Sequence, residues 1–325
     1  MRSLYQRALV LLTALLPTLL VTPTHAERYP DRPIRLIVPF NAGPGPDFLA
    51  RVIARRLEDQ FGWTLVVENK AGAGGNIGTN EVAKAKPDGY TLLMGHVGAL
   101  AVNPSIYPKL PFDPKVDFAP VGMVGTAPLA LVTGKDSPYR SLADVVAAAK
   151  AGKRLSYGYS GTGTISHLGG AILGNAAGIE LVNVPYKGAS QGLIDLAGGR
   201  LDLYMSSVAT LAGHVQAGKL HALAVTSAQR FPGLPEVPTV AEQGFPDFDA
   251  TTWFAIVAPR GTPPERVATL NDALVKVLAD PELQAQFRNA GTLPKASTPE
   301  ALARFRDSEA AHWGRIAKDI GVKPE

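Results

Sequence analysis

Runs of apolar and polar residues along the chain predict two successive blocks of strands and helices. In the first block, the apolar run Ile34–Phe40 precedes a stretch from Asp47 in which apolar residues recur at helical spacing. A second strand is expected at Thr64–Asn69, then a helix that continues to about Lys86, and a third strand at Tyr90–Gly95. This β-α-β-α-β order predicts a parallel sheet with helices on both faces.

The second block begins after a proline-studded stretch, Asn103–Pro120, which we interpret as a surface connection. Ser141 is placed to cap a helix that extends to Lys150, with Asp144 in its first turn. Strands are expected at Pro128–Gly134, Leu155–Ser160, Leu181–Tyr186, Leu201–Ser206 and His221–Ser227, and helices from about Thr164 and over Ser190–Ala197 and Val208–Ala217.

The last part of the chain predicts a return to the first block. A second proline-rich connection, Arg230–Phe248, leads to a strand at Thr251–Pro259. Three helices are expected after it, at Pro263–Leu278, Pro281–Ala290 and Pro299–Ile320. We expect the late strand to rejoin the first sheet, so that the chain crosses twice between two lobes. Two crossings would form a hinge, and two lobes would enclose a cleft.

The first 26 residues have the pattern of a secretory signal peptide. Positively charged residues precede the apolar run Ala8–Val21, and small residues suited to cleavage follow up to Ala26. The run contains Pro17 and is shorter than the roughly 20 residues that a membrane span needs. We therefore expect cleavage after Ala26 and a mature protein in the periplasm.

Charge and cysteine content exclude several classes of site. Without the signal peptide the chain carries 30 basic and 28 acidic residues, too small an excess to predict a nucleic-acid-binding face. The absence of cysteine excludes disulfides, thiolate metal sites and thiol nucleophiles. The six histidines show no metal-ligand spacing, so we expect no metal and no other cofactor.

Three glycine-rich turns carry the candidate chemistry. The turns Phe40–Asp47, Ala71–Asn76 and Ser160–His167 each join the end of a predicted strand to the start of a helix. A helix start exposes unpaired N–H groups that attract anions, and glycine lets the backbone approach a ligand closely. In open parallel sheets, ligands bind beyond the carboxyl ends of the strands, where these turns would lie. The turns therefore predict an anion site.

Nucleotide and catalytic sites fit the same turns less well. The fingerprint G-x-G-x-x-G would require glycine at position 77, which is Ile77, and no turn has the ending of a P-loop. Gly158–Thr162 departs from the nucleophile elbow G-x-S-x-G in its last residue. Ser160 and His167 could meet across a turn, although neither has an evident orienting acid. A periplasmic hydrolase that uses this pair remains an alternative.

Longer motifs resemble the Bug/TctC-type extracytoplasmic solute receptors, which serve tripartite tricarboxylate transporters. They cover nearly the whole mature chain in order, and include "VVENKAGAGGNIGTNEVAKAKPDGYTLLMG", "SYGYSGTGTISHL", "VPYKGASQGLIDLAGGRLDL" and "LPEVPTVAEQGFPDF". The resemblance implies an α/β, type II-like periplasmic-binding-protein fold with two lobes, each a mostly parallel sheet with flanking helices, and a hinge of two crossover segments. Lobe 1 would comprise residues 27–127 and 252–325, and lobe 2 residues 128–251.

The resemblance also implies a function without catalysis. The protein would capture a small carboxylate between its lobes as a monomer and deliver it to the membrane permease of a tripartite tricarboxylate transporter. An alternative is a sensor subunit that presents the closed form to a membrane-bound signalling receptor. The sequence does not separate these two roles, because the lobe surfaces carry no readable partner motif.

Carried over by position, the resemblance implies a ligand site with residues from both lobes. Pro44 and Pro46 stand where many relatives carry glycine and a hydroxyl residue, and Pro46 lacks an N–H donor, so part of the usual carboxylate contact is expected to differ. A serine at 206 offers no charge to an ammonium group, which favours plain carboxylates or aromatic acids over amino acids. The implied residues are Phe40, Gly43, Gly45, Asp47, Gly74, Gly75 and Asn76 in lobe 1, and Ser160, Gly163, Thr164, His167, Tyr186 and Ser206 in lobe 2.

Several of these side chains also have a purely structural interpretation. Asp47 and Asn76 could cap their helices rather than contact an anion, and Thr164 has the same two options. His167, on the first turn of its helix, could donate a hydrogen bond to an anion. Trp253 could either line the cleft or support the hinge.

Overall fold

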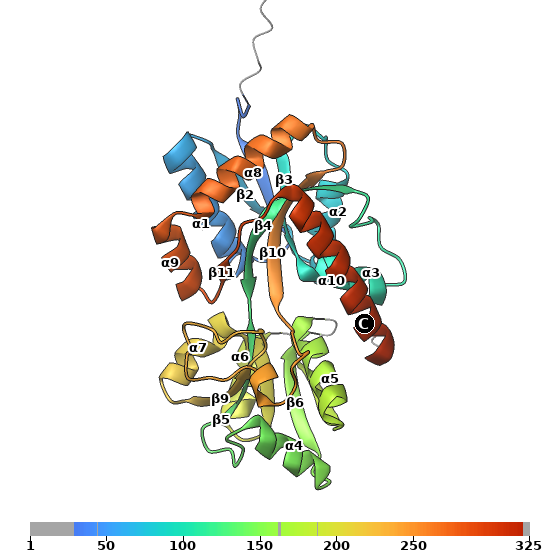
Figure 1. Cartoon of the computed structure of the whole chain (residues 1–325), viewed down its shortest axis with the longest axis vertical. Coiled ribbons are helices and arrows are strands. Elements are labelled where there is room, and N and C mark those ends of the chain that lie inside the picture. Colours follow the sequence, from blue (N-terminus) through green and yellow to red (C-terminus); the bar gives the residue numbers. More distant parts are fainter. Residues whose placement is uncertain (1–28, 44, 162–163, 187, 321–325) are drawn as a thin grey trace, which may run out of the picture. The chain divides into compact units, whose positions relative to one another are not determined.

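The structure is a computed structural model that describes residues 29–43, 45–161, 164–186 and 188–320. The predicted signal peptide, residues 1–26, lies outside the described residues. The described helices and strands belong to one compact unit, Arg32–Glu325 (Figure 1). Within the described ranges, none of the helices combines the length and the apolar character that crossing a membrane requires.

The first sheet has six strands in the order β11-β4-β10-β3-β1-β2. Its parallel part is the predicted β-α-β-α-β block, in which β1 (Ile34–Val38) pairs with β2 (Leu65–Asn69) and β3 (Thr91–His96). The late strand rejoins this sheet as predicted. It is β10 (Thr252–Pro259), which runs antiparallel between β3 and β4, and the other strands are β4 (Phe118–Ala127) and β11 (Leu293–Pro294).

The second sheet has five strands in the order β7-β6-β8-β5-β9. Strand β6 (Leu155–Ser160) lies between β7 (Leu181–Tyr186) and β8 (Leu203–Ser207) and runs parallel to both. In contrast, β5 (Leu129–Gly134) is antiparallel to β8 and to β9 (Leu220–Val225). Both sheets are therefore more mixed than expected, with their parallel pairs gathered around β1 and β6.

Helices connect the strands and flank the two sheets (Figure 1). The Ser141 cap is confirmed: its side chain accepts the Asp144 N–H at 3.1 Å, and the Asp144 carboxylate accepts the Ser141 N–H at 2.9 Å. The helices are α1 (Pro46–Phe61), α2 (Asn76–Ala83), α3 (Asn103–Ile106), α4 (Leu142–Lys150), α5 (Ile165–Ala177), α6 (Ala189–Ala197), α7 (Val208–Gln216), α8 (Pro264–Leu278), α9 (Pro281–Asn289) and α10 (Pro299–Ile320).

The prediction that Asn103–Pro120 is a surface connection was wrong at its two ends, whereas residues 107–117 form no helix or strand and are largely exposed. A π-helical turn, Gly98–Val102, leads directly into α3, and β4 already begins at Phe118. Phe112 and Phe118 are buried, with their ring centroids 6.1 Å apart. The prolines misled the sequence interpretation because proline is also tolerated in the first turn of a helix and at strand ends.

Two crossover segments join the sheets, one from β4 to β5 and one that enters β10. The fully buried hydroxyl of Thr226 contacts both of them. It accepts the Leu129 N–H at 2.9 Å and donates to the Ala250 carbonyl at 2.9 Å. The Thr226 backbone adds a bond from its N–H to the Leu129 carbonyl, at 2.9 Å, and one from the Ala250 N–H to its carbonyl, at 3.2 Å. One threonine thus ties the two crossover segments together.

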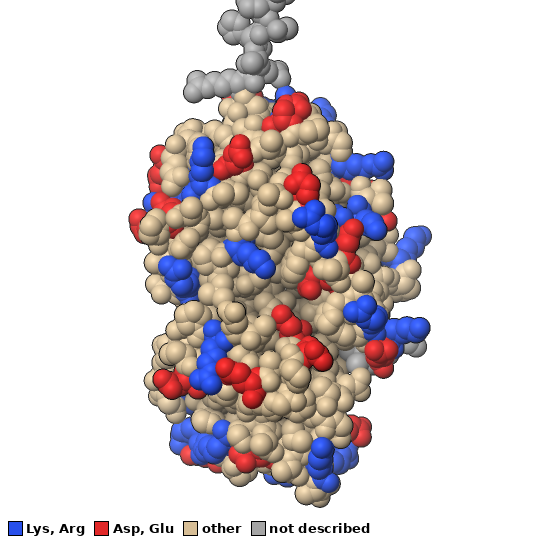
Figure 2. Space-filling model, viewed as in Figure 1, with Lys and Arg blue, Asp and Glu red and all other residues tan. Residues whose placement is uncertain are grey.

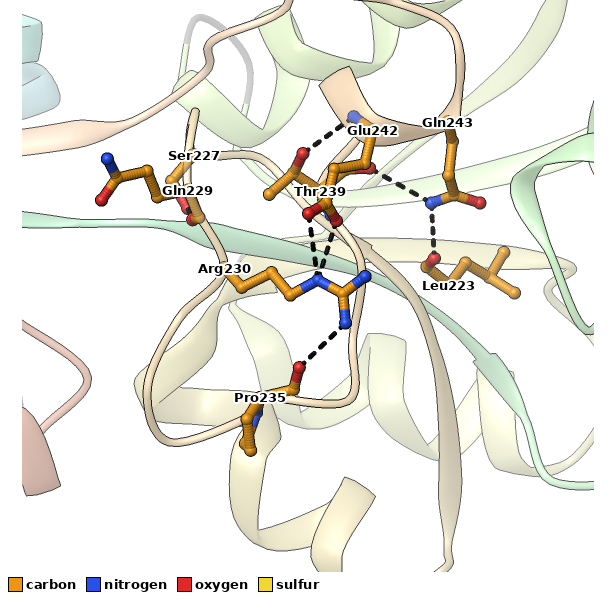
Figure 3. A network of polar contacts seen from close by, with 8 residues as sticks. All are labelled: Leu223, Ser227, Gln229, Arg230, Pro235, Thr239, Glu242 and Gln243. Carbon is orange, nitrogen blue, oxygen red and sulfur yellow. Dashed lines mark hydrogen bonds and ion pairs between the residues drawn. The ribbon is translucent and has the colours of Figure 1, made fainter.

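A polar network orders the second proline-rich connection (Figure 3). Arg230 Nε donates to both carboxylate oxygens of Glu242, at 3.1 and 2.8 Å. Glu242 and Thr239 bond reciprocally, each side chain accepting the backbone N–H of the other, at 2.9 and 3.0 Å. Gln243 donates to the Leu223 carbonyl at 2.9 Å and so attaches the connection to β9. This segment is therefore held in place although it contains only the short 3₁₀ turn Ala241–Gln243.

Trp253 supports β10 rather than lining a cleft. Its side chain is buried, and its indole N–H donates to Glu309 Oε2 at 2.9 Å. The indole N–H of Trp313 donates to the same oxygen at 3.1 Å, and the Phe305 ring lies 5.4 Å from the Trp253 ring. These contacts attach α10 to the strand that enters from the second crossover segment.

Candidate functional site

The buried carboxylate of Asp47 fixes the first glycine-rich turn through hydrogen bonds. This carboxylate, 3% exposed, accepts the Gly43 N–H at 3.0 Å, Asn69 Nδ2 at 2.9 Å and Arg51 Nε at 3.0 Å. Asn69 Nδ2 also donates to the Phe40 carbonyl at 3.0 Å. The Asp47 oxygens are thus occupied by the protein itself, which favours a structural role for this carboxylate over contact with an anion.

The helix after this turn begins without a side-chain cap. Its N-cap is Gly45, whose φ of 79° lies in the left-handed region that favours glycine. Pro46 occupies the first turn and has no N–H, so the first backbone donors of α1 are those of Asp47 and Phe48. Such donors can bind an anion without a basic side chain.

Asp47 has a pKa below its ordinary value. Burial alone would raise the pKa of this carboxyl, but the hydrogen bonds from Arg51, Gly43 and Asn69 together outweigh burial and lower it. A carboxylate whose pKa is lower in the folded than in the unfolded protein stabilises the fold above its ordinary pKa. This stabilisation disappears as the pH falls through the lowered value.

We expect Asp47→Asn to lower the free energy of unfolding by about 1–3 kcal/mol at pH 7, because charge-assisted hydrogen bonds are lost. The difference from the wild type should shrink below about pH 4, where the wild-type carboxyl also becomes protonated in the unfolded chain. Urea unfolding at pH 7 and pH 3 measures both effects. Asp59→Asn, at an exposed position of the same helix, is the control and should change stability by less than about 0.5 kcal/mol. A deficit as large at pH 3 as at pH 7 would contradict the expectation.

The second glycine-rich turn contains a short 3₁₀ segment, Ala73–Gly75, that leads into α2. Gly74 and Gly75 have φ values of 62° and 91°, and α2 also begins without a side-chain cap. The Asn76 side chain is buried and turned toward the protein, where its Oδ1 accepts Asn103 Nδ2 at 2.7 Å. The turn therefore presents backbone, while Asn76 fastens it to α3.

His96 is a residue of this region that sequence reasoning missed. It ends β3 beside the second turn and is 7% exposed. Its ring packs edge-on against Phe40 of the first turn, with centroids 4.6 Å apart. A Cβ added to Gly75 would lie 2.5 Å from His96 Nε2. The two turns thus meet across one imidazole, a contact that no local spacing in the sequence could have indicated.

Three predicted residues lie at the carboxyl edge of the second sheet. Ser160 is paired with Tyr186 across β6 and β7, and its hydroxyl lies 2.7 Å from that of Tyr204. Ser206 follows the β8 residue paired with Tyr159, so it lies beside Ser160. The structure therefore brings Ser160, Tyr186 and Ser206 together.

Tyr186 is a neutral member of this group, and its single hydroxyl hydrogen is used within the protein. Its hydroxyl donates to Asp195 Oδ2 at 2.9 Å. Burial, together with the hydrogen bond to the Asp195 carboxylate, raises the pKa of Tyr186 to about 12. The Asp195 carboxylate is also bonded by Arg200 Nη2 at 2.6 Å, so its negative charge is compensated.

The third glycine-rich turn begins α5. Thr164 is its N-cap: the hydroxyl accepts the His167 N–H at 3.4 Å and lies 2.7 Å from the Gly161 carbonyl. The His167 ring stacks on Tyr159, with centroids 4.4 Å apart. Gly163 lies outside the described residues. The side chain of Thr164 thus has the capping role, while its exposure leaves it accessible from solvent.

Two neighbouring cavities separate the first turn from α7. The larger, about 550 Å³, is lined by Gly43, Gly45 and Phe48, by Ala209 of α7 and by the end of α9. The smaller, about 390 Å³, shares Gly45 and Ala209 and also touches Ser207. Both volumes are in the range of small-molecule sites. They are bounded on one side by residues that follow the first sheet and on the other by residues that follow the second.

Charge is distributed evenly over the face shown in Figure 2. Lysine and arginine residues alternate there with aspartate and glutamate residues, without a continuous patch of one sign. Within the described residues there is no cluster of three or more histidine and acidic side chains suited to a metal ion.

Comparison with known proteins identifies the family. Residues 49–322 match the tripartite tricarboxylate transporter family receptor, TctC. The chain is 37% identical over 306 residues to the protein BugT of Bordetella pertussis (strain Tohama I), covering 94% of each chain. R. palustris Rpa4515, solved with adipate, superposes with a TM-score of 0.82 at 37% identity, over 91% of this chain and all of that one. The periplasmic binding protein BugD superposes with a TM-score of 0.79 at 36% identity, with the same coverage. The chain therefore belongs to the TctC family of solute-binding receptors of tripartite tricarboxylate transporters.

Proposed function

We propose that this receptor captures a small carboxylate between its two lobes in the periplasm and delivers it, as a monomer, to the membrane permease subunits of a tripartite tricarboxylate transporter. The lobes would be residues 27–127 with 252–325, and residues 128–251, after removal of the signal peptide at residues 1–26. One observation carries the proposal. The uncapped start of α1 borders a cavity of about 550 Å³ whose opposite wall includes Ala209 of α7.

The site supports recognition of an anion by neutral donors. In lobe 1, the backbone at Gly43, Gly45, Gly74 and Gly75 would approach the ligand, while Asp47 and Asn76 hold the two turns in shape. In lobe 2, the hydroxyl groups of Ser160 and Ser206, together with Tyr186, would face it from the sheet edge. Phe40, Gly163, Thr164 and His167 would complete the site.

We infer that the ligand is a small acid without an ammonium group, and that linear dicarboxylates are the first class to test. The relative Rpa4515, at 37% identity, was solved with adipate. The polar groups gathered at the second sheet edge are hydroxyls, and the carboxylate that contacts one of them, Asp195, is already bonded by Arg200 and Tyr186. An ammonium group would therefore lack a free counter-charge among these residues.

Closure of the lobes would follow from ligand binding. A ligand that contacts both lobes lowers the free energy of the closed state and shifts the hinge equilibrium toward it. Micromolar affinity corresponds to about 8 kcal/mol. Four or five charge-assisted hydrogen bonds, at about 1.5–3 kcal/mol each before ordering costs, suffice for this affinity.

A binding panel tests the proposal. We expect adipate or another small carboxylate to raise the free energy of unfolding by about 2.7 kcal/mol at a hundredfold excess over its dissociation constant. Calorimetric titration of adipate, malate, citrate, benzoate, glutamate and ATP would identify the class, and chromatography of the mixture should recover the acid unchanged. Stabilisation by ATP alone, or conversion of the acid into a product, would contradict the proposal.

A further inference from the structure

His96 is held in a single orientation by Gly98 and Phe40. Its Nδ1 accepts the Gly98 N–H at 3.1 Å, and Phe40 packs against the ring from the first turn. A Cβ added at Gly98 would lie 2.5 Å from His96 Cε1, so the imidazole fills space that this glycine leaves. Rotation of the ring would break the hydrogen bond and collide with these neighbours.

This orientation fixes the position of the ring hydrogen. Because Nδ1 accepts a hydrogen bond, the neutral ring carries its hydrogen on Nε2. Burial lowers the pKa of His96 to about 4, so the ring is neutral at periplasmic pH. His96 therefore offers one N–H donor, of fixed direction and without charge.

The Nε2 donor has no hydrogen-bond partner within the described residues, although the atom is buried. A buried donor without an acceptor destabilises the fold, and native proteins seldom leave one unless it serves a function or binds a molecule. Gly75 of the second glycine-rich turn lies on this side, where an added Cβ would come within 2.5 Å of Nε2. The unpartnered donor thus lies directly behind the backbone that was predicted to hold an anion.

Gly75 is suited to act as a movable cover over this donor. It has no side chain, and its φ of 91° is accessible to glycine at little cost. The preceding residues Gly72 and Gly74 also have positive φ values, 130° and 62°. A small displacement of this turn would expose Nε2 to a ligand that lies against it.

We propose that His96 donates its Nε2 hydrogen to a carboxylate oxygen of the bound acid, which reaches it past Gly75. The inference rests on the proposed function, because it requires that the glycine-rich turn holds a carboxylate. It adds a ligand contact from a side chain that the family motifs did not indicate. It also gives the buried donor the acceptor that it lacks within the described residues.

Two substitutions distinguish the contribution of the Nε2 donor from that of the rest of the imidazole ring. His96→Asn can keep the bond from the Gly98 N–H through its amide oxygen, but it withdraws the donor from the Nε2 position. His96→Gln is long enough to place an amide N–H near that position. His214→Asn, at an exposed position of α7, is the matched control. With adipate as the probe, we expect about a 10- to 100-fold loss of affinity for His96→Asn, a loss of less than about fivefold for His96→Gln, and no change for His214→Asn.

Nitrogen-15 NMR of labelled histidines supplies a second measurement. Adipate would leave the His96 signal unchanged if the role of His96 were purely structural. Adipate should shift the His96 Nε2–H proton downfield and slow its exchange with solvent, and the Asn variant assigns the signal. An unshifted signal in the adipate-saturated protein overturns the inference, as do variants that lose affinity only in proportion to their melting temperature. If the wild type binds adipate and all variants bind it equally, the inference fails and the proposed function stands. If the wild type binds no acid of the panel, both fail.

Discussion

Replacement of Thr226 by valine is expected to lower the free energy of unfolding by about 2–6 kcal/mol. Valine has nearly the same shape, but it leaves the Leu129 N–H and the Ala250 carbonyl without their hydroxyl partner, each at about 1–3 kcal/mol. Both groups belong to the crossover segments, so the variant should also hold the hinge less firmly. Urea unfolding measures the first effect, and the change in radius of gyration on ligand binding measures the second.

Thr133→Val provides the matched control for this substitution. Thr133 is also fully buried and also lies in the second sheet, but its hydroxyl makes a single long bond, 3.4 Å, to the Tyr139 carbonyl. Valine there should cost about 1 kcal/mol or less and leave the hinge unchanged. Equal losses for the two variants would mean that Thr226 contributes by burial alone and does not join the crossover segments.

Most helices and strands of this fold were predictable because their apolar residues recur at the short spacing of a helix or a strand. The strand at Leu155–Ser160 and the helix at Pro299–Ile320 have the predicted bounds, and Ser141 caps α4 as expected. The strand β4 was missed because Gly122 and Gly125 interrupt its apolar run. Both positions are glycine because residues distant in the sequence pack closely against them. A Cβ on Gly122 would lie 2.8 Å from Asn271 of α8, and a Cβ on Gly125 would lie 2.7 Å from Leu293 of β11. Such partners cannot be read from local sequence.

The candidate site was also predictable from the sequence only in part. The glycine-rich turns were recognisable, since strand end, glycine and helix start follow one another in the sequence. The role of Asp47 was not decidable, because its partner Asn69 lies 22 residues away and reaches it only through the pairing of β1 with β2. His96 was passed over for the same reason. Its significance comes from Phe40 and Gly75, which β1 and the second turn bring against it from more than 20 residues away.

Replacement of Gly75 by alanine should impair both stability and ligand binding. A φ of 91° costs an alanine about 1–2 kcal/mol, and the added Cβ would lie 2.5 Å from His96 Nε2. The ring cannot retreat, because Phe40 and Gly98 enclose it, so overpacking adds about 1–3 kcal/mol. We expect a total loss of about 2–5 kcal/mol in unfolding experiments, with at least a tenfold loss of affinity for adipate because the added methyl group would lie between the Nε2 donor and the ligand.

Gly178→Ala is the control that measures the cost of backbone strain at a positive φ without a collision with the His96 ring. Gly178 has a φ of 63° and ends α5, and a Cβ there would meet no atom within 4 Å. Alanine at 178 should therefore cost only the 1–2 kcal/mol of strain, with unchanged affinity. In a His96→Ala background, where the obstructing ring is gone, the cost of Gly75→Ala should fall to the same value. A cost that is the same with and without the imidazole would show that the turn does not rest on His96, and the meeting of the first two glycine-rich turns across this ring would lose its support.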